Sequence, residues 1–275
     1  MDPYRGTFGA CRPAELASLP LPPHTMPSHQ GTRALKAWRY VGVYGPEMML
    51  CLAQVRIGRA HQSFWAVWDR RGQRLYQRSV LGHGGVRFEL GRAELLERGL
   101  SVGIVLDEQP GIETVCPNGD SYAWTRKQAP VRARVVIELE GERRDFEALA
   151  VIDDTAAYYP RHTHWRWSAG VGRSVDGEQL AWNLVSGVND PPSGSERTVW
   201  VDGRAHEAPP CHFADDLSGV DALRFEAEDG LDRKENLVLV RSRYRAPFGS
   251  FSGELPGGLR LAEGFGVMEE HEVWW

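Results

Sequence analysis

The residues best suited to chemistry are concentrated between positions 151 and 204. This stretch holds four of the ten tryptophans, together with the doublets Asp153–Asp154 and Tyr158–Tyr159. Aromatic and charged side chains are costly to bury at such density unless they bond to one another or to a ligand. We therefore expect a ligand pocket to be built around this stretch.

The aspartate doublet directly follows the apolar run ALAVI, where the pattern predicts that a strand ends and a loop begins. Such a pair commonly closes a turn through hydrogen bonds to its own backbone. The alternative is a carboxylic acid that tyrosines and tryptophans desolvate, so that its pKa rises into the range of a general acid. Asp153 and Asp154 are thus candidate catalytic acids, and Tyr159 is a candidate ligand contact.

Residues 162–169 alternate in character, as expected for a strand. One face carries His162, His164, Arg166 and Ser168, and the other carries Thr163, Trp165, Trp167 and Ala169. Either the tryptophans form a core face opposite an exposed polar face, or one of the faces lines a cavity with indole walls. We take His162 as a candidate proton-transfer residue and Trp165, Arg166 and Trp167 as candidate ligand contacts. The His-x-His spacing alone does not complete a metal site, and we predict none.

Four further candidates lie on later strands. Asn183 faces away from its apolar neighbours in GEQLAWNLVSGV, and its amide bonds either to the backbone or to a ligand oxygen. Glu196 begins the next strand, either as an acid or as the ion-pair partner of Arg166. Glu269 and His271 share one side of the C-terminal strand, where they are either a proton-transfer pair or the exposed end of that strand.

The elements that must position these residues read as strands. From Ala37 onward, short runs rich in β-branched and aromatic residues recur at roughly ten-residue spacing between Gly and Pro turns. Only RAELLER, residues 92–98, has good helix formers in succession, and it predicts a turn or two of helix. We therefore predict an all-β protein of antiparallel barrels or sandwiches with few short helices.

The length of the chain suits two such units. A barrel of about eight strands needs roughly 120 residues, and the chain has 275. Residues 1–36 are rich in proline, which predicts an extended lead-in that crosses the surface. We predict a first β-barrel half over residues 37–145 and a second over residues 146–275.

Composition excludes several classes of function. A net charge of −5 without a clustered basic stripe argues against nucleic-acid binding. The four cysteines form no CxxC pair, which favours reduced thiols. The sequence has no signal-peptide pattern and no apolar run of about 18 residues, so we predict no membrane span and expect a cytoplasmic protein. Phosphate-binding glycine loops, the GxSxG elbow and HExxH are absent from the sequence.

Several runs resemble a known family. These runs are DDTAAYYPRHTHWRWSAGVG, AWNLVSGVND, SERTVWVDGR, ENLVLVRSRYRAPFGSFSGELPGG and EGFGVMEEH. They are similar to a bacterial family known only as a domain of unknown function, and more distantly to the AttH-like and hydroxyneurosporene synthase (carotenoid hydratase) group. The resemblance implies two lipocalin-like, calycin-like β-barrel halves packed together, with a ligand cavity at or near their junction.

Members of that wider group include hydratases, dehydratases and cyclases that act on apolar substrates by proton transfer, with no organic cofactor. The resemblance implies pocket positions for Asp153, Asp154, Tyr159, Trp165 and Trp167. We therefore expect the chain to enclose a small apolar or isoprenoid-like molecule. It does so either as a cofactor-free hydratase, dehydratase or cyclase, or as a non-catalytic binding or carrier protein. The sequence does not specify the oligomeric state.

Overall fold

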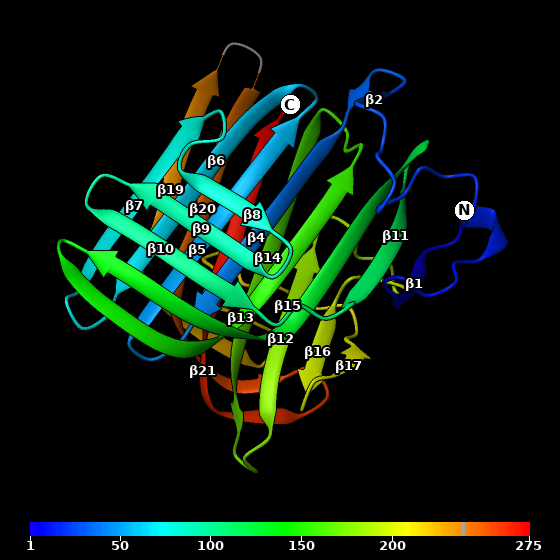
Figure 1. Ribbon diagram of the computed structural model, residues 1–275. Coiled ribbons are helices and arrows are strands. Elements are labelled where there is room, and N and C mark those ends of the chain that lie inside the picture. The colour runs from blue at the N-terminus through cyan, green and yellow to red at the C-terminus, as the bar shows by residue number, and fades with distance from the viewer. Residues whose placement is uncertain (238–239) are drawn as a thin grey trace.

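Antiparallel strands form nearly all of the regular structure, as Figure 1 shows for the computed structural model, which describes residues 1–237 and 240–275. The first sheet contains β1 (Tyr4–Thr7), β4 (Lys36–Tyr44), β5 (Met48–Ile57), β6 (Ala60–Asp69), β7 (Arg74–Leu81), β8 (Val86–Glu89), β9 (Arg92–Glu97), β10 (Leu100–Leu106), β11 (Ile112–Asn118), β12 (Ser121–Leu139) and β13 (Glu142–Ala157). The second contains β14 (His162–Ser174), β15 (Gln179–Ser186), β16 (Thr198–Val201), β17 (Arg204–Glu207), β18 (Gly219–Val220), β19 (Leu223–Leu237), β20 (Val240–Leu255) and β21 (Leu259–Trp274). The 3-10 helix η1 (Ala14–Leu16) and the short pair β2 (His29–Gln30) and β3 (Arg33–Ala34) belong to neither sheet. The all-β prediction is confirmed.

The first sheet folds over on itself. Its strand order is β7-β6-β5-β4-β13-β12-β10-β9-β8, and β8 to β10 lie across β4 to β6 in Figure 1. Strand β12 makes this possible because residues 121–127 pair with β11 whereas residues 133–139 pair with β10. Its register against β13 shifts between Gln128 and Val131, as at a β-bulge, where a strand can bend. The enclosed space is filled by an apolar core that includes Val41, Leu52 and Ile104.

The helix predicted for residues 92–98 is wrong, because this segment forms strand β9. Ala93 and Leu95 alternate with exposed or half-buried residues, and both enter the core of the first sheet. Tertiary burial of this period-2 face outweighs the helix propensity of its residues. Among residues 1–237 and 240–275, no helix has the length and apolarity needed to cross a membrane.

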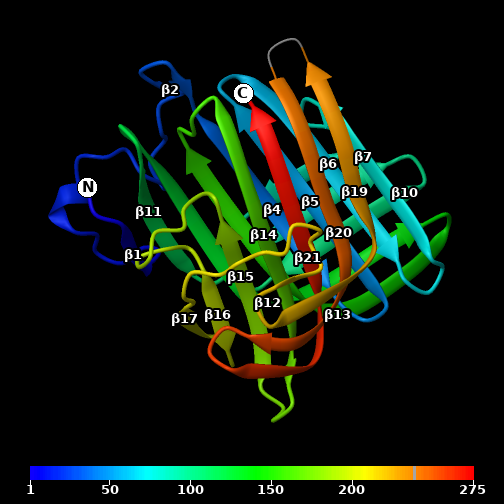
Figure 2. The ribbon, with the colours of Figure 1, turned by 180° about the vertical axis from the view of Figure 1, so that it is seen from behind.

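The second sheet packs against the outer face of the first. Figure 2 shows β14, β21, β20 and β19 in front of β4, β5 and β6. Strand β4 is therefore buried on both faces: Val41 and Val43 point into the first sheet's core, whereas Tyr40 and Tyr44 enter the core between the sheets. That second core also receives Trp167 and other apolar residues of the second sheet.

Polar contacts join the two sheets along β6 and β19. The indole of Trp68 donates to Glu228 at 2.8 Å, and Arg70 donates to the same carboxylate at 2.7 Å. At the other end of these strands, the amide of Gln62 donates to Glu235 at 3.2 Å.

The chain leaves the first sheet at the end of β13 and enters the second at the start of β14, so residues 158–161 connect the two sheets. Residue 145, where the first predicted half ends, lies within β13.

The segment predicted as a lead-in, residues 1–36, packs against the first sheet. Strand β1 pairs with β11, and the residues that follow bury Leu16, Leu21 and Met26 in a small core of their own against Tyr158. The segment therefore adds apolar packing to one end of the first sheet.

The core of the first sheet should contribute strongly to the free energy of unfolding of the protein. Leu52 is fully buried there, and Leu52→Ala should lower the free energy of unfolding by about 2–5 kcal/mol in urea denaturation. Leu96→Ala, which truncates a leucine that is 72% exposed, is the matched control and should change it by less than about 0.5 kcal/mol. Equal losses in the two variants would contradict this description of the core.

Candidate functional site

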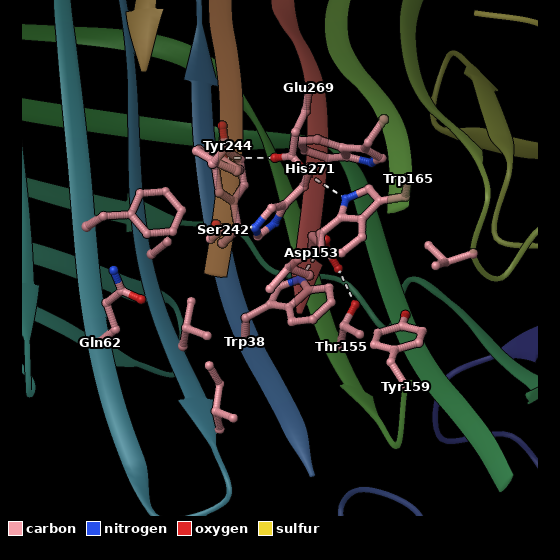
Figure 3. Close-up of a pocket in the computed structure, with 18 of the residues that line it drawn as sticks. Trp38, Gln62, Asp153, Thr155, Tyr159, Trp165, Ser242, Tyr244, Glu269 and His271 are labelled. Carbon is pink, nitrogen blue, oxygen red and sulfur yellow. Dashed lines mark hydrogen bonds between the residues drawn. The ribbon is translucent and has the colours of Figure 1, made fainter. Parts of the chain in front are cut away.

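A cavity lies between the two sheets, with a volume of about 120 Å³. This approaches the size of an apolar cavity of ~150 Å³ that holds benzene in another protein, so a ring-sized ligand group fits. The first sheet contributes Trp38, Tyr40, Phe64, Lys127, Asp153 and Thr155, and the second contributes Trp165, Trp167, Arg233, Tyr244, Glu269 and His271. Figure 3 shows the labelled side chains converging from strands of both sheets.

The tryptophan face of β14 lines this cavity. Trp165 stacks parallel to Trp38 of the opposite sheet, with ring centroids 6.1 Å apart and planes at 6°, and Tyr159 stacks against both. Of the two faces between which the sequence did not choose, the structure thus places the indoles inside. They form an aromatic wall whose π faces attract positive charge.

The polar face of β14 points away from the cavity. His162 contacts Glu272 at 3.2 Å, His164 contacts Glu270 at 3.2 Å, and Arg166 pairs with Glu270 at 3.0 Å. The structure therefore brings neither His162 nor Arg166 to the cavity, and Arg166 does not pair with Glu196. Within the described ranges, no group of three or more His, Cys, Asp or Glu side chains is placed to hold a metal ion.

The aspartate doublet divides between two environments. Both residues lie inside β13, so the turn considered for them does not form. Asp153 faces the cavity and accepts hydrogen bonds from Trp38 at 3.0 Å and Thr155 at 2.8 Å. Asp154 points to the opposite face, where it pairs with Arg39 at 3.1 Å and does not line the cavity. The two side chains separate because successive residues of a strand face opposite ways.

A buried lysine connects Asp153 of the first sheet to Glu196, which lies between β15 and β16 of the second. Lys127 lies directly opposite Asp153 on β12, with its ammonium 2.5 Å from the Asp153 carboxylate and 3.3 Å from that of Glu196. All three side chains are buried. The two carboxylates hold the pKa of Lys127 above its usual value despite burial, whereas desolvation raises the pKa of Glu196.

Glu269 is a buried acid whose side-chain hydrogen-bond partners are both aromatic residues. Its carboxylate accepts hydrogen bonds from the Trp165 indole at 2.7 Å and the Tyr244 hydroxyl at 2.8 Å, both drawn in Figure 3. No cation pairs with it among the described residues, since Lys127 bonds elsewhere. Burial raises the pKa of Glu269 to about 7, so its protonated and ionised forms coexist near neutral pH.

His271 lies two residues along the same face of β21. Its Nε2 is 2.8 Å from the Ser242 hydroxyl, and its ring packs 4.4 Å from that of Trp165 and 5.0 Å from that of Tyr244. Burial lowers the pKa of His271 to about 3, so the imidazole is neutral at physiological pH. Glu269 and His271 both line the cavity, and the alternative of an exposed strand end does not hold.

The loop after β15 closes one side of the cavity. It begins at Gly187, whose φ of 95° and whose closeness to the His164 carbonyl leave no room for a side chain, since a Cβ would lie 2.5 Å from that oxygen. Asn189 then donates to the Tyr159 hydroxyl at 2.7 Å and to Glu196 at 3.2 Å. Asn183 supports this loop through the Glu196 carbonyl at 3.0 Å and does not line the cavity.

Sequence reasoning missed Lys127, Trp38, Tyr244 and Arg233, because each comes from a strand far from residues 151–204. One signal was present. The chain has only three lysines, and two of them, Lys36 and Lys127, are buried. The rarity of lysine, in a chain whose other basic residues are almost all arginines, is the signal that could have drawn attention to Lys127.

Comparisons with known proteins agree with the fold. Residues 82–275 match the family described as domain of unknown function DUF2804. The crystal structure of a protein assigned as AttH from Nitrosomonas europaea is similar, with a TM-score of 0.51 and 12% identity over 92% of this chain and 98% of that one. Kievitone hydratase from Nectria haematococca has a TM-score of 0.52 and 10% identity over 86% and 88%. No curated protein sequence matches significantly. The predicted AttH-like, lipocalin-like fold is confirmed.

Removal of the lysine should be severely destabilising. Lys127→Met would leave two buried carboxylates without their cation, and we expect a loss of about 3–5 kcal/mol in the free energy of unfolding. Arg74→Met, which breaks the exposed pair with Glu140, is the control and should have little effect. A loss for Lys127→Met no larger than for this control would show that the buried ion pairs do not hold the fold.

The raised pKa of Glu269 predicts a pH-dependent stability. Between its ordinary value of 4.5 and about 7, the unfolded chain ionises this group while the folded protein keeps it protonated. The folded state then binds more protons, so its stability falls as pH rises through that window and levels off above it. Across this window the free energy of unfolding of the wild type should fall by up to about 3 kcal/mol, and Glu269→Gln should remove that fall.

Urea denaturation of the wild type and the Glu269→Gln variant at pH values from 4.5 to 8 measures this slope. The exposed Glu263 on the same strand supplies the control, because Glu263→Gln should retain the wild-type profile. Parallel profiles for wild type and Glu269→Gln would contradict the assignment.

Proposed function

The chain belongs to the family described as domain of unknown function DUF2804, and on that premise we propose that it binds a small apolar molecule between its sheets and transforms it by cofactor-free acid–base chemistry. Hydration or dehydration of an alkene, or a cyclisation that begins with the same protonation, is the reaction class. The observation that carries this proposal is Glu269, an acid that is buried among aromatic rings of the cavity and that no cation pairs with in residues 1–237 and 240–275.

Glu269 is the proton donor in this proposal. Its carboxylic acid transfers a proton to one alkene carbon, the C=C π bond breaks, and positive charge develops on the neighbouring carbon. A water molecule then forms a C–O bond at that carbon, and the resulting oxonium returns a proton to the Glu269 carboxylate. The sum is addition of water across the double bond, and dehydration is the reverse. Desolvation supports this role because it keeps part of Glu269 protonated near neutral pH.

The walls of the cavity support the developing charge. Trp165 and Trp38 present stacked indoles, whose π faces favour a cation. Asp153 has its carboxylate fixed by Lys127, Thr155 and Trp38 and contributes a preorganised negative charge. In this proposal Asp153 stabilises charge and does not transfer the proton, and Asp154 and His162 have no part because they do not line the cavity.

The second candidate is a non-catalytic binding or carrier protein that uses the same cavity. It is favoured by the way that Glu269, Asp153 and His271 are already hydrogen-bonded to neighbouring side chains. A carrier needs an apolar lining with satisfied polar groups, and no group that exchanges protons with its ligand.

Turnover in isotopically labelled water separates the two candidates. The purified protein is incubated with small isoprenoid alkenes and their tertiary alcohols, and mass spectrometry follows uptake of labelled oxygen. We expect uptake with the wild type, unchanged uptake with Glu263→Gln, and rates about 10²–10⁴-fold lower with Glu269→Gln. Ligand binding without any turnover by the wild type would favour the carrier, and unchanged turnover by Glu269→Gln would remove this residue from the mechanism.

A further inference from the structure

Arg233 is a cation of the cavity for which the proposed reaction has no use. We propose that its guanidinium binds an acceptor oxygen of the ligand, so that the ligand is an apolar molecule with a neutral carbonyl group near one end. This inference rests on the proposed function, because it names the ligand class of the same cavity, and it assigns Arg233 to recognition.

Aromatic rings from both sheets hold the guanidinium in place. The Arg233 Cζ atom lies 4.8 Å from the ring centroid of Phe64 on β6 and 5.3 Å from that of Tyr244 on β20. These two rings are themselves 5.7 Å apart. The planes of the two rings are tilted by 57°, so the guanidinium lies between two differently oriented aromatic faces, and neither ring offers its N–H groups a conventional hydrogen-bond acceptor. Arg233 is thus preorganised to donate hydrogen bonds.

The donors of Arg233 are not fully used inside the protein. Its Nε is buried and has no hydrogen-bond partner within residues 1–237 and 240–275. The acid two residues along β19, Glu235, is instead bonded by Gln62 at 3.2 Å. Within the described residues, Lys127 and Arg233 are the lysine and arginine that line the cavity. The charge of Lys127 is already paired with Asp153 and Glu196, which leaves Arg233 to meet a ligand. A buried donor without an acceptor is unfavourable, and a ligand oxygen would satisfy it.

The surrounding charges favour a neutral oxygen over an anionic one. Glu235 and Glu269 line the same cavity as Arg233, so a ligand carboxylate would be repelled by both wherever they are ionised. A carbonyl oxygen accepts from a guanidinium without adding charge. The Tyr244 ring that packs against Arg233 also carries the hydroxyl bonded to Glu269 at 2.8 Å. A ligand held at its oxygen by Arg233 would therefore extend along Tyr244 toward the proton donor.

Isothermal titration calorimetry with three probes of similar shape tests this inference. The probes are 4-phenylbutan-2-one, a ketone; butylbenzene, the hydrocarbon; and 3-phenylpropionate, the anion. The wild type should bind the ketone about tenfold or more tightly than the hydrocarbon, and more tightly than the anion. Arg233→Met keeps the apolar stem on the rings and should lose this preference while it binds the hydrocarbon about as well as the wild type. Arg233→Lys should retain part of the preference.

Arg243→Met is the matched control, because Arg243 is an exposed arginine on the adjacent strand β20, and it should behave as the wild type. Equal affinities of the wild type for ketone and hydrocarbon overturn the inference even if no variant folds. A wild-type preference that survives in Arg233→Met also overturns it, and tighter binding of the anion overturns the choice of a neutral carbonyl. Failure of all three probes to bind the wild type would count against the cavity as a binding site, and so against the proposed function itself.

Discussion

The buried ammonium of Lys127 is the constraint on which the arrangement of the two halves depends. It is bonded to Asp153, its cross-strand neighbour in the first sheet, and to Glu196, which belongs to the second half. Each of these groups is costly to desolvate alone, so all three are stable in the interior only while they stay together. The second sheet must therefore lie where Glu196, in the segment between its strands β15 and β16, reaches the lysine, and the cavity lies between the two sheets in this arrangement.

The same period-2 rule that made the fold predictable left the site ambiguous. Alternating strands with Gly and Pro turns were enough to predict an all-β chain and to divide residues 162–169 into two faces. The rule could not say which aspartate of the doublet enters the cavity, because β13 is largely buried on both faces around these two residues. In β14 the side chains of His162, His164 and Arg166 are exposed or half-buried, so alternation separates the two faces of that strand but does not reveal that a cavity lies against one of them. With apolar residues on both sides of a strand, register is settled by partner strands that the local pattern does not reveal.

Tyr244 and Arg233 could not be predicted as cavity residues, for a different reason. Tyr244 and Arg233 come from β20 and β19, where the sequence RKEN and RSRYR reads as the polar end of a hairpin. They face a cavity only because β19 lies against β6, a contact between residues far apart in the chain that Gln62 and Trp68 help to fix. Residues 92–97 form strand β9 for a similar reason, because Ala93 and Leu95 pack into a core that distant strands assemble.

Neutralisation by Lys127 also shapes the chemistry that Glu269 can perform. The charge of Asp153 raises the pKa of Glu269 and the charge of Lys127 lowers it, so the two members of this ion pair act on the acid in opposite directions. With the lysine present, burial is the main cause of the raised pKa of Glu269, and the hydrogen bonds from Tyr244 and Trp165 limit the rise to about 7. The same lysine that joins Asp153 to Glu196 thus also contributes to the acidity of Glu269, as a smaller influence than burial and the two hydrogen bonds.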